Sequence, residues 1–305
     1  MTALLVSHRF RAVYGDRFIA DAKARDIALE LLVLPDDPEA RLADDLAARA
    51  EVAYFSSDVF PQFGKPFFSA TRKAAGLKWL HVFNAGVDHP VFASILERGV
   101  RLTTSSGTAA APIAQTAIAG MLYLSREVAG QTILIYGFGK IGAGIARLAR
   151  LLGMRVIGMR RNAQPHPLAD EMLTPDQLHA ALARSDWLAL ACPLTNETRR
   201  VIDAAALAAM PAGARVINIS RGEVIDEPAL IAALQSKHLG GAYLDVFAQE
   251  PLPAESPLWD LPNVLVTAHD AATSDAYDRR INALFLDNLA RWQRDEALIN
   301  EVTKL

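Results

Sequence analysis

Short apolar runs alternate along this chain with longer segments in which apolar residues recur every three or four positions. In roughly the first third, the runs at residues 4–7, 28–34, 52–55, 77–83 and 100–103 are typical of short buried strands. Segments rich in alanine and charge lie between them, and residues 38–50 are one predicted helix. Such alternation of strands and helices predicts a parallel sheet covered by helices.

The same alternation continues in the rest of the chain after a long apolar helix predicted at residues 109–125. Further strands are expected at residues 133–136, 155–159, 187–192, 215–219, 242–247 and 264–267. Six parallel strands with helices between them fit a doubly wound nucleotide-binding domain. A last helix from about Ala276 carries one apolar face, made of Ile281, Leu284, Phe285, Leu289 and Trp292. No strand follows this helix, so we expect it to pack on the first domain.

A glycine motif follows the first strand of the second half. Residues 137–142 read Gly137-Phe138-Gly139-Lys140-Ile141-Gly142, between an apolar run and an amphipathic segment that ends at Gly153. A strand, a tight glycine turn and a helix are the context that a dinucleotide-binding motif requires. The glycines allow a sharp turn, a close approach of backbone to pyrophosphate and close packing of helix on strand. We therefore predict a dinucleotide site; a βαβ unit that binds nothing is the alternative.

The end of the next strand indicates which dinucleotide is bound. An NAD site usually has an acidic residue there, which accepts hydrogen bonds from the ribose hydroxyls. This chain has Arg160 and Arg161 instead. Two guanidinium groups suit a 2′-phosphate, which they hold through charge-assisted hydrogen bonds. The sequence favours NADP(H) over NAD(H), unless the two arginines belong only to a solvated loop.

Composition limits the remaining possibilities. A chain of 305 residues suits two domains, and a net charge of −3 gives no reason to expect nucleic acid or an anionic membrane as a partner. Neither a signal peptide nor a membrane span is recognisable, so a cytoplasmic location is the default expectation. The single cysteine, Cys192, ends an apolar run, where a small buried residue is expected rather than a nucleophile. No metal site is predicted.

Polar residues stand just past three of the predicted strands: Arg221, Glu250 and His269. In open α/β sheets, ligands bind at the carboxyl ends of the strands, here expected in the cleft between the two domains. An arginine would anchor the carboxylate of a 2-oxo acid and polarise its ketone. A histidine would protonate the ketone oxygen, and a glutamate would hold the imidazole and favour its charged form. Together the three residues predict reduction of a 2-oxo acid.

With these residues in place, the chain resembles the D-isomer-specific 2-hydroxyacid dehydrogenases, closely from Gly137 to His269 and more loosely before. The resemblance rests on residues 191–198 (ACPLTNET), 217–227 (INISRGEVIDE) and 244–252 (LDVFAQEPL). It implies a flavodoxin-like substrate domain, residues 1–103 plus 275–305, and a Rossmann dinucleotide-binding domain, residues 104–274. It also implies D-2-hydroxy acid products, and the chain is most similar to the NADP-dependent glyoxylate/hydroxypyruvate reductases.

The resemblance also implies roles for single residues. Arg221, Glu250 and His269 correspond to the catalytic residues of the family, and Asp245 to the aspartate that orients the nicotinamide carboxamide. Further cofactor contacts are implied at Pro193 and Thr198. A glycine turn at residues 84–88 would bind the substrate carboxylate through the backbone of Ala85, Gly86 and Val87.

Departures from the family leave alternatives open. Glu250 stands where formate dehydrogenase has glutamine, which argues against formate oxidation. No regulatory domain is recognisable after the last helix, which argues against the larger phosphoglycerate dehydrogenases. A nucleotide-sensing protein with little turnover, like the family's co-repressor branch, and a dehydrogenase of a small oxyanion such as phosphite remain possible. Relatives carry a longer stretch at the join near Ser125–Val128, and they typically pair as dimers. We expect a homodimer, with Ile113, Ala117, Met121 and Leu124 available as an apolar face.

Overall fold

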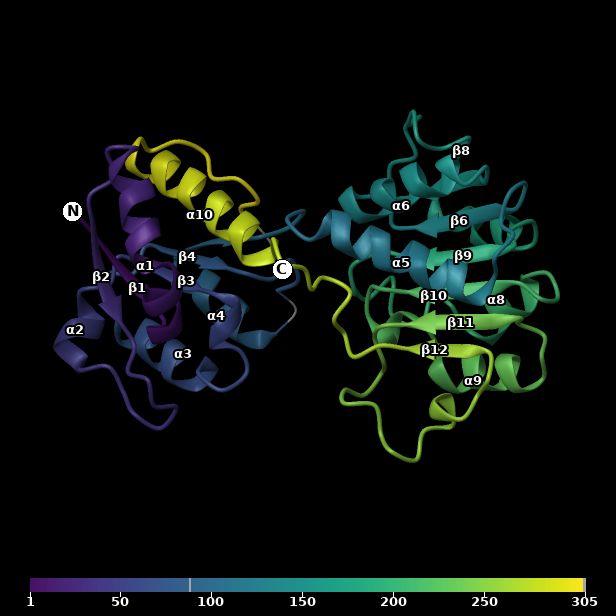
Figure 1. The fold of residues 1–305 in the computed structure, drawn as a ribbon, viewed down its shortest axis with the longest axis horizontal. Helices are drawn as coiled ribbons and strands as arrows, with labels where there is room; N and C mark the ends of the chain where they lie inside the picture. The colour runs from purple at the N-terminus through teal and green to yellow at the C-terminus, as the bar shows by residue number, and fades with distance from the viewer. Residues whose placement is uncertain (88, 304–305) are drawn as a thin grey trace. The chain divides into compact units, whose positions relative to one another are not determined.

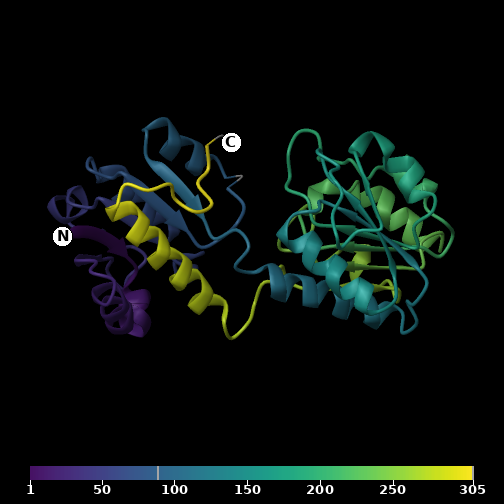
Figure 2. The ribbon, with the colours of Figure 1, turned by 90° about the horizontal axis from the view of Figure 1, so that it is seen from above.

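The computed structural model describes residues 1–87 and 89–303, which form two compact units. One unit comprises Met1–Thr108 and Asp275–Leu305, and the other comprises Ala109–Ser274. Each unit is a parallel sheet with helices on it (Figures 1 and 2). Within the described ranges, no helix is both long enough and apolar enough to cross a membrane.

The first unit contains five parallel strands in the order β2-β1-β3-β4-β5. All five lie where the apolar runs predicted strands. The strands are β1 (Thr2–Val6), β2 (Leu29–Val33), β3 (Val52–Phe55), β4 (Trp79–Val82) and β5 (Arg101–Thr104); the helices between them are α1 (His8–Lys23), α2 (Asp44–Ala48), the short 3-10 helix η1 (Ser57–Val59), α3 (Gly64–Lys73) and α4 (Pro90–Glu97).

The helix predicted at residues 38–50 was too long, because only α2 forms there. The Asp37 carboxylate accepts a hydrogen bond from the Glu39 backbone N–H at 2.9 Å, across Pro38. This local bond gives the backbone an alternative to a helical turn, and aspartate next to proline is typical of turns. The helix therefore begins only after this turn.

The last helix, α10 (Tyr277–Gln293), packs on the first unit as predicted. Its Phe285 is fully buried and stacks on Tyr54 of β3, with 4.3 Å between ring centroids. The same ring lies 5.3 Å from Trp79 of β4. The C-terminal helix therefore completes the hydrophobic core on one face of the five-stranded sheet.

The second unit contains seven parallel strands in the order β12-β11-β10-β9-β6-β7-β8, the doubly wound arrangement. Six of them match predicted strands, and β8 (Glu171–Leu173) was missed because three residues after a proline loop give too short a pattern. The other strands are β6 (Thr132–Tyr136), β7 (Arg155–Met159), β9 (Trp187–Leu190), β10 (Arg215–Asn218), β11 (Gly241–Leu244) and β12 (Val264–Val266).

Helices cover both faces of this sheet (Figure 2). Ile133 and Ile135 of β6 pack in the core under α5 and α6, while Leu134 and Tyr136 pack in the core on the opposite face. The helices are α5 (Ala110–Leu124), α6 (Lys140–Leu151), α7 (Leu178–Leu182), α8 (Ala204–Ala209) and α9 (Glu227–Gln235), with short 3-10 turns η2 (Pro175–Gln177), η3 (Gly222–Val224) and η4 (Pro257–Trp259).

The apolar face predicted for pairing on α5 belongs to the core instead. Ala117 and Met121 are fully buried, and Ile113 and Leu124 pack against the same cluster beside α6 and β11. That prediction was wrong because this apolar face of α5 packs against the sheet and helix α6 of its own unit. The exposed apolar side chains at the end of α5 are Leu122 and Tyr123.

Candidate active site

All strands of the second sheet are parallel, so the loops that follow them meet at one edge. At that edge, Gly137 has a φ of +102°, and a Cβ on it would lie 2.4 Å from the Cys192 backbone nitrogen. A Cβ on Gly142 would lie 2.2 Å from the Gly137 carbonyl oxygen. Only glycine fits at both positions, so α6 begins directly against the turn.

The remaining glycine of the motif is different. Gly139 is the N-cap of α6, and apart from its two chain neighbours no described residue lies within 4 Å of the position that its Cβ would occupy. Gly139 is exposed, so the amino end of α6 is open at this position, and the first N–H groups of a helix have no partner within the helix. Such a helix end attracts phosphate, because unpaired N–H groups and the helix dipole both favour negative charge. The turn thus fits the pyrophosphate of a dinucleotide.

The other motif residues support this turn. Phe138 is buried, and a Cβ on Gly158 of β7 would lie 2.6 Å from the Phe138 ring, so that glycine makes room for it. The Phe138 ring also makes an edge contact with His166 at 5.0 Å. Lys140 is exposed at the first position of α6, and Ile141 packs against the core under the helix.

Arg160 and Arg161 follow β7 at the same edge. The Arg160 guanidinium donates to the Gln164 carbonyl at 3.2 Å, while its buried Nε has no hydrogen-bond partner among the described residues. An unpartnered buried N–H destabilises the protein unless a ligand or water satisfies it. Arg161 is exposed. The pKa of Glu197 is lowered mainly by a hydrogen bond from Thr195 and by the backbone, and the charge of Arg161 adds a smaller contribution.

Pro193 and Thr198 form a closed turn after β9. The Thr198 hydroxyl donates to the Pro193 carbonyl at 2.7 Å and accepts from the Thr195 N–H at 2.8 Å. The strand order reverses between β6 and β9, which is where doubly wound sheets bind nucleotides. Cys192, just before this turn, is buried, and burial raises its pKa to about 12, so it stays a neutral thiol as expected.

Arg221 lies after β10, in a loop fixed by Asn218. The Asn218 amide donates to the Arg221 carbonyl at 3.0 Å, and its oxygen accepts from the Ser220 N–H and hydroxyl at 3.1 and 2.8 Å. A Cβ on Gly222 would lie 1.8 Å from the Phe247 carbonyl carbon. The arginine loop therefore presses directly on the loop that carries Glu250.

His269 and Glu250 form a hydrogen-bonded pair. His269 Nδ1 lies 2.8 Å from Glu250 Oε2, and Glu250 Oε1 accepts from the Phe247 N–H at 3.1 Å. The side chains are 47% and 38% exposed, and no described residue hydrogen-bonds to His269 Nε2. One ring nitrogen is thus held by a carboxylate, and the other is free to exchange a proton with a ligand.

Asp245 holds the histidine loop, a contact that sequence reasoning missed. Its carboxylate is 2% exposed and accepts from the Thr267 hydroxyl at 2.5 Å and from the Asp270 and Ala271 N–H groups at 3.0 and 3.2 Å. His269 lies between these partners with a φ of +54°. Burial raises the pKa of Asp245, opposed by these hydrogen bonds. Thr267 carried no sequence signal beyond its place at a strand end.

The predicted carboxylate-binding turn lies in the first unit, directly after β4. The Asn84 side-chain amide donates to the Gly86 carbonyl, and the Asn84 carbonyl accepts from the Ser105 N–H at 3.1 Å. Ala85 is exposed, and Gly86 and Val87 are half-buried. Asp88, the last residue of the predicted turn, lies outside the described residues.

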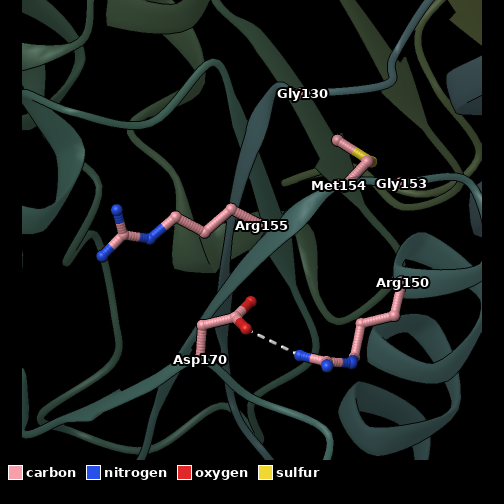
Figure 3. A pocket seen from close by; sticks show the side chains of 6 residues that line it. All are labelled: Gly130, Arg150, Gly153, Met154, Arg155 and Asp170. Carbon is pink, nitrogen blue, oxygen red and sulfur yellow. Dashed lines mark hydrogen bonds and ion pairs between the residues drawn. The ribbon is translucent and has the colours of Figure 1, made fainter.

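In the second unit, a depression of about 510 Å³ lies near the amino ends of β6 and β7, at the other end of the strands from the loops that carry Arg221, Glu250 and His269. Figure 3 shows that Arg150 and Asp170 point toward each other across it, while Arg155 extends away from the pair. Asp170 accepts from Arg150 and from the Val156 N–H, both at 2.8 Å. The Asp170 carboxylate therefore holds the start of β7. The candidate catalytic residues Arg221, Glu250 and His269 follow the carboxyl ends of their strands instead.

Comparison with known proteins identifies the family. Residues 107–271 match the family model described as D-isomer specific 2-hydroxyacid dehydrogenase, NAD binding domain. A glyoxylate reductase of Korarchaeum cryptofilum is 37% identical over 187 residues, which are 60% of this chain and 55% of that protein. A glyoxylate/hydroxypyruvate reductase B of Pectobacterium carotovorum is 31% identical over 293 residues, 82% of this chain and 91% of that protein.

Solved structures agree over nearly the whole chain. A D-isomer specific 2-hydroxyacid dehydrogenase from Xanthobacter autotrophicus Py2, crystallised with NADPH and MES, has a TM-score of 0.80 and 28% sequence identity. The match covers 99% of this chain and 97% of that one. The chain carries a nicotinamide-dinucleotide-binding domain, and it belongs to the D-isomer-specific 2-hydroxyacid dehydrogenase family.

Proposed function

We propose that this protein uses NADPH to reduce a small 2-oxo acid, such as glyoxylate or hydroxypyruvate, to the D-2-hydroxy acid. The observation that carries the proposal is the hydrogen bond between His269 Nδ1 and Glu250 Oε2 at 2.8 Å, on the edge of the sheet that also carries the glycine turn. A carboxylate-held imidazole with its second nitrogen free is suited to proton transfer.

The reaction adds one hydrogen to carbon and one to oxygen. When bound, the reduced nicotinamide supplies the hydride that the C2 carbon of the 2-oxo acid accepts. His269 donates its Nε2 proton to the former ketone oxygen, and Glu250 keeps the protonated imidazole oriented. Arg221 anchors the substrate carboxylate and stabilises negative charge on the ketone oxygen, since a guanidinium offers two parallel donors.

The substrate carboxylate also needs backbone donors, and we assign these to Ala85, Gly86 and Val87. Peptide N–H groups in a tight turn bind an anion without a charged side chain. Asn84 supports this role, because its side chain closes the turn onto the Gly86 carbonyl.

The cofactor is assigned as NADP(H) on the two arginines after β7. Arg160 donates to the Gln164 carbonyl through one terminal nitrogen at 3.2 Å, and a guanidinium at this place offers charge-assisted hydrogen bonds to a 2′-phosphate. The open position at Gly139, at the amino end of α6, is assigned to the pyrophosphate, and residues 137–142, Pro193 and Thr198 are assigned to the further cofactor contacts. The related Xanthobacter structure contains NADPH. Asp245 is assigned to the nicotinamide carboxamide on family resemblance.

Steady-state assays of the unmodified protein test this function. NADPH and NADH are each offered with glyoxylate, hydroxypyruvate, pyruvate and longer 2-oxo acids, and NADP⁺ is offered with phosphite in parallel. The proposal expects oxidation of NADPH with a small 2-oxo acid and weaker use of NADH. Reduction of NADP⁺ by phosphite alone would favour the oxyanion dehydrogenase. Cofactor binding without any turnover would favour the sensor.

We also propose a homodimer that forms through the second unit. Leu122 and Tyr123 at the end of α5 are 37% and 70% exposed, beside the short join to β6. Two apolar side chains at a helix end fit a small symmetric contact. Light scattering at micromolar and sub-micromolar concentrations tests this assembly, and a monomer throughout would contradict it.

A further inference from the structure

A chain of hydrogen bonds runs through the interior of the first unit and ends beside the proposed carboxylate-binding turn. At its centre is His81 of β4, which is fully buried and stacks on Phe285 of α10 at 5.1 Å. Its partners are Thr103 and Ser105, both buried, on and just after the neighbouring strand β5. The proposed catalytic mechanism uses none of these three side chains.

The direction of the bonds follows from what each group is able to donate. Trp79 Nε1 is only a donor, and it donates to the Thr103 hydroxyl at 2.8 Å. A hydroxyl that accepts one hydrogen bond is able to accept a second, so the Ser105 hydroxyl decides the tautomer. It donates its only hydrogen to the Val82 carbonyl at 3.0 Å, and it therefore accepts from His81 Nε2, also at 3.0 Å. With the ring proton on Nε2, Nδ1 of the neutral imidazole accepts from the Thr103 hydroxyl, 2.7 Å away.

The imidazole has a single stable form in this setting. Burial alone lowers the pKa of His81 to about 3, and no charged group contributes to that change. A second ring proton would also face the Thr103 hydroxyl, which already points its hydrogen at Nδ1. His81 therefore stays neutral, with its proton directed at Ser105.

Ser105 connects this chain to the turn. Its backbone N–H donates to the Asn84 carbonyl at 3.1 Å, and Asn84 closes onto the Gly86 carbonyl through its side chain. The Ser105 carbonyl accepts from the Thr108 hydroxyl at 2.7 Å. The position of Ser105 thus fixes where the turn begins.

We propose that His81 is a positioning residue, which through Ser105 holds the turn at residues 84–87 in the form that binds the substrate carboxylate. The inference rests on the proposed function, because that turn is assigned to the substrate there. The side chain of His81 itself touches no substrate. Its contribution is to order backbone donors before the anion arrives, which improves affinity by reducing what must be ordered on binding.

Two variants with similar losses in the same core separate positioning from simple packing. Ser105→Ala removes the link between His81 and the turn. Tyr54→Phe removes a different buried bond, that from the Tyr54 hydroxyl to Asn282 at 2.7 Å, in a ring that lies 5.7 Å from His81. Loss of one neutral hydrogen bond corresponds to roughly three- to tenfold in an equilibrium constant. We expect KM for glyoxylate to rise by about that factor in Ser105→Ala, with kcat and NADPH affinity kept, and to stay unchanged in Tyr54→Phe.

Variants of His81 give a second comparison. His81→Leu removes the hydrogen bonds to Thr103 and to Ser105, and it should raise KM for glyoxylate as Ser105→Ala does. His81→Gln keeps an amide donor for Ser105 and should restore KM at least in part. Equal KM values in all four variants and the unmodified protein would overturn the inference.

Amide hydrogen exchange provides a readout that needs no activity. Exchange at residues 85–87 should become faster in Ser105→Ala and stay unchanged in Tyr54→Phe. If the unmodified protein reduces no 2-oxo acid but this difference is found, the proposed function fails and the hold of Ser105 on the turn stands. Equal exchange at the turn in both variants would show that His81 only fills the core.

Discussion

The substitution Gly139→Ala separates cofactor binding from folding. Apart from the two chain neighbours, no described residue lies within 4 Å of the position that the new Cβ would occupy, and the backbone there is extended, with φ −93° and ψ −157°. The protein itself therefore accommodates alanine without a clash. Gly→Ala at a compatible site also stiffens the unfolded chain, which changes stability by at most about 1 kcal/mol. Folding should be nearly unaffected.

Binding should behave differently, because the same Cβ occupies the space assigned to the pyrophosphate. Displacing the anion lengthens its hydrogen bonds to the N–H groups at the start of α6, and bonds to charged groups contribute about 1.5–3 kcal/mol each. Loss of one such bond weakens NADPH binding by roughly ten- to a hundredfold.

The assay is titration calorimetry of NADPH, with the free energy of unfolding measured by urea denaturation in the absence of cofactor. Gly142→Ala is the matched control, since its Cβ would lie 2.2 Å from the Gly137 carbonyl oxygen and should destabilise the fold itself. Overpacking of this kind typically costs about 1–3 kcal/mol. If Gly139→Ala binds NADPH as tightly as the unmodified protein, the pyrophosphate does not approach Gly139 and the reasoning is wrong.

Three further predictions concern single residues. Arg221→Lys keeps the charge but loses the two-donor geometry, so kcat/KM for glyoxylate should fall through both KM and kcat; unchanged kinetics would place the carboxylate elsewhere. Arg160→Asp removes a charge-assisted bond worth about 1.5–3 kcal/mol, so the ratio of kcat/KM for NADPH over NADH should fall roughly ten- to a hundredfold; an unmodified protein that prefers NADH would refute the assignment. His81, with a folded pKa of about 3 against 6.5 unfolded, stabilises the fold above pH 6.5 and loses that contribution as pH falls. The free energy of unfolding should therefore decrease by up to about 1.4 kcal/mol per pH unit more than in His81→Leu, and identical slopes in urea denaturation would contradict this.

The sequence was sufficient for the architecture because both sheets are buried on two faces. Runs such as residues 133–136 and 187–190 are wholly apolar, and such runs identify central parallel strands. Edge and turn positions were harder, because short polar segments are governed by local hydrogen bonds. The strand at Glu171–Leu173 was missed, and the helix before Asp44 was overextended, for this reason.

The candidate site shows the same division. The residue types at strand ends indicated Arg221, Glu250 and His269, because parallel strands bring such ends to one edge. Contacts that hold them depend on packing between loops distant in sequence. The three bonds that Asp245 accepts from residues 267–271 and the contact of Gly222 with Phe247 had no pattern in the sequence. For α5, the spacing of apolar residues correctly indicated one apolar face. It did not indicate that the sheet and helix α6 of the same unit cover that face.

The decisive comparison is between the unmodified protein and His269→Gln, followed as oxidation of NADPH by glyoxylate or hydroxypyruvate. Glutamine preserves the bulk of the side chain but has no proton to donate as an acid. If His269 protonates the ketone oxygen, kcat should fall by about 10²–10⁴-fold while the dissociation constant for NADPH stays within twofold. A His269→Gln enzyme that keeps near-native kcat would contradict the proposed function.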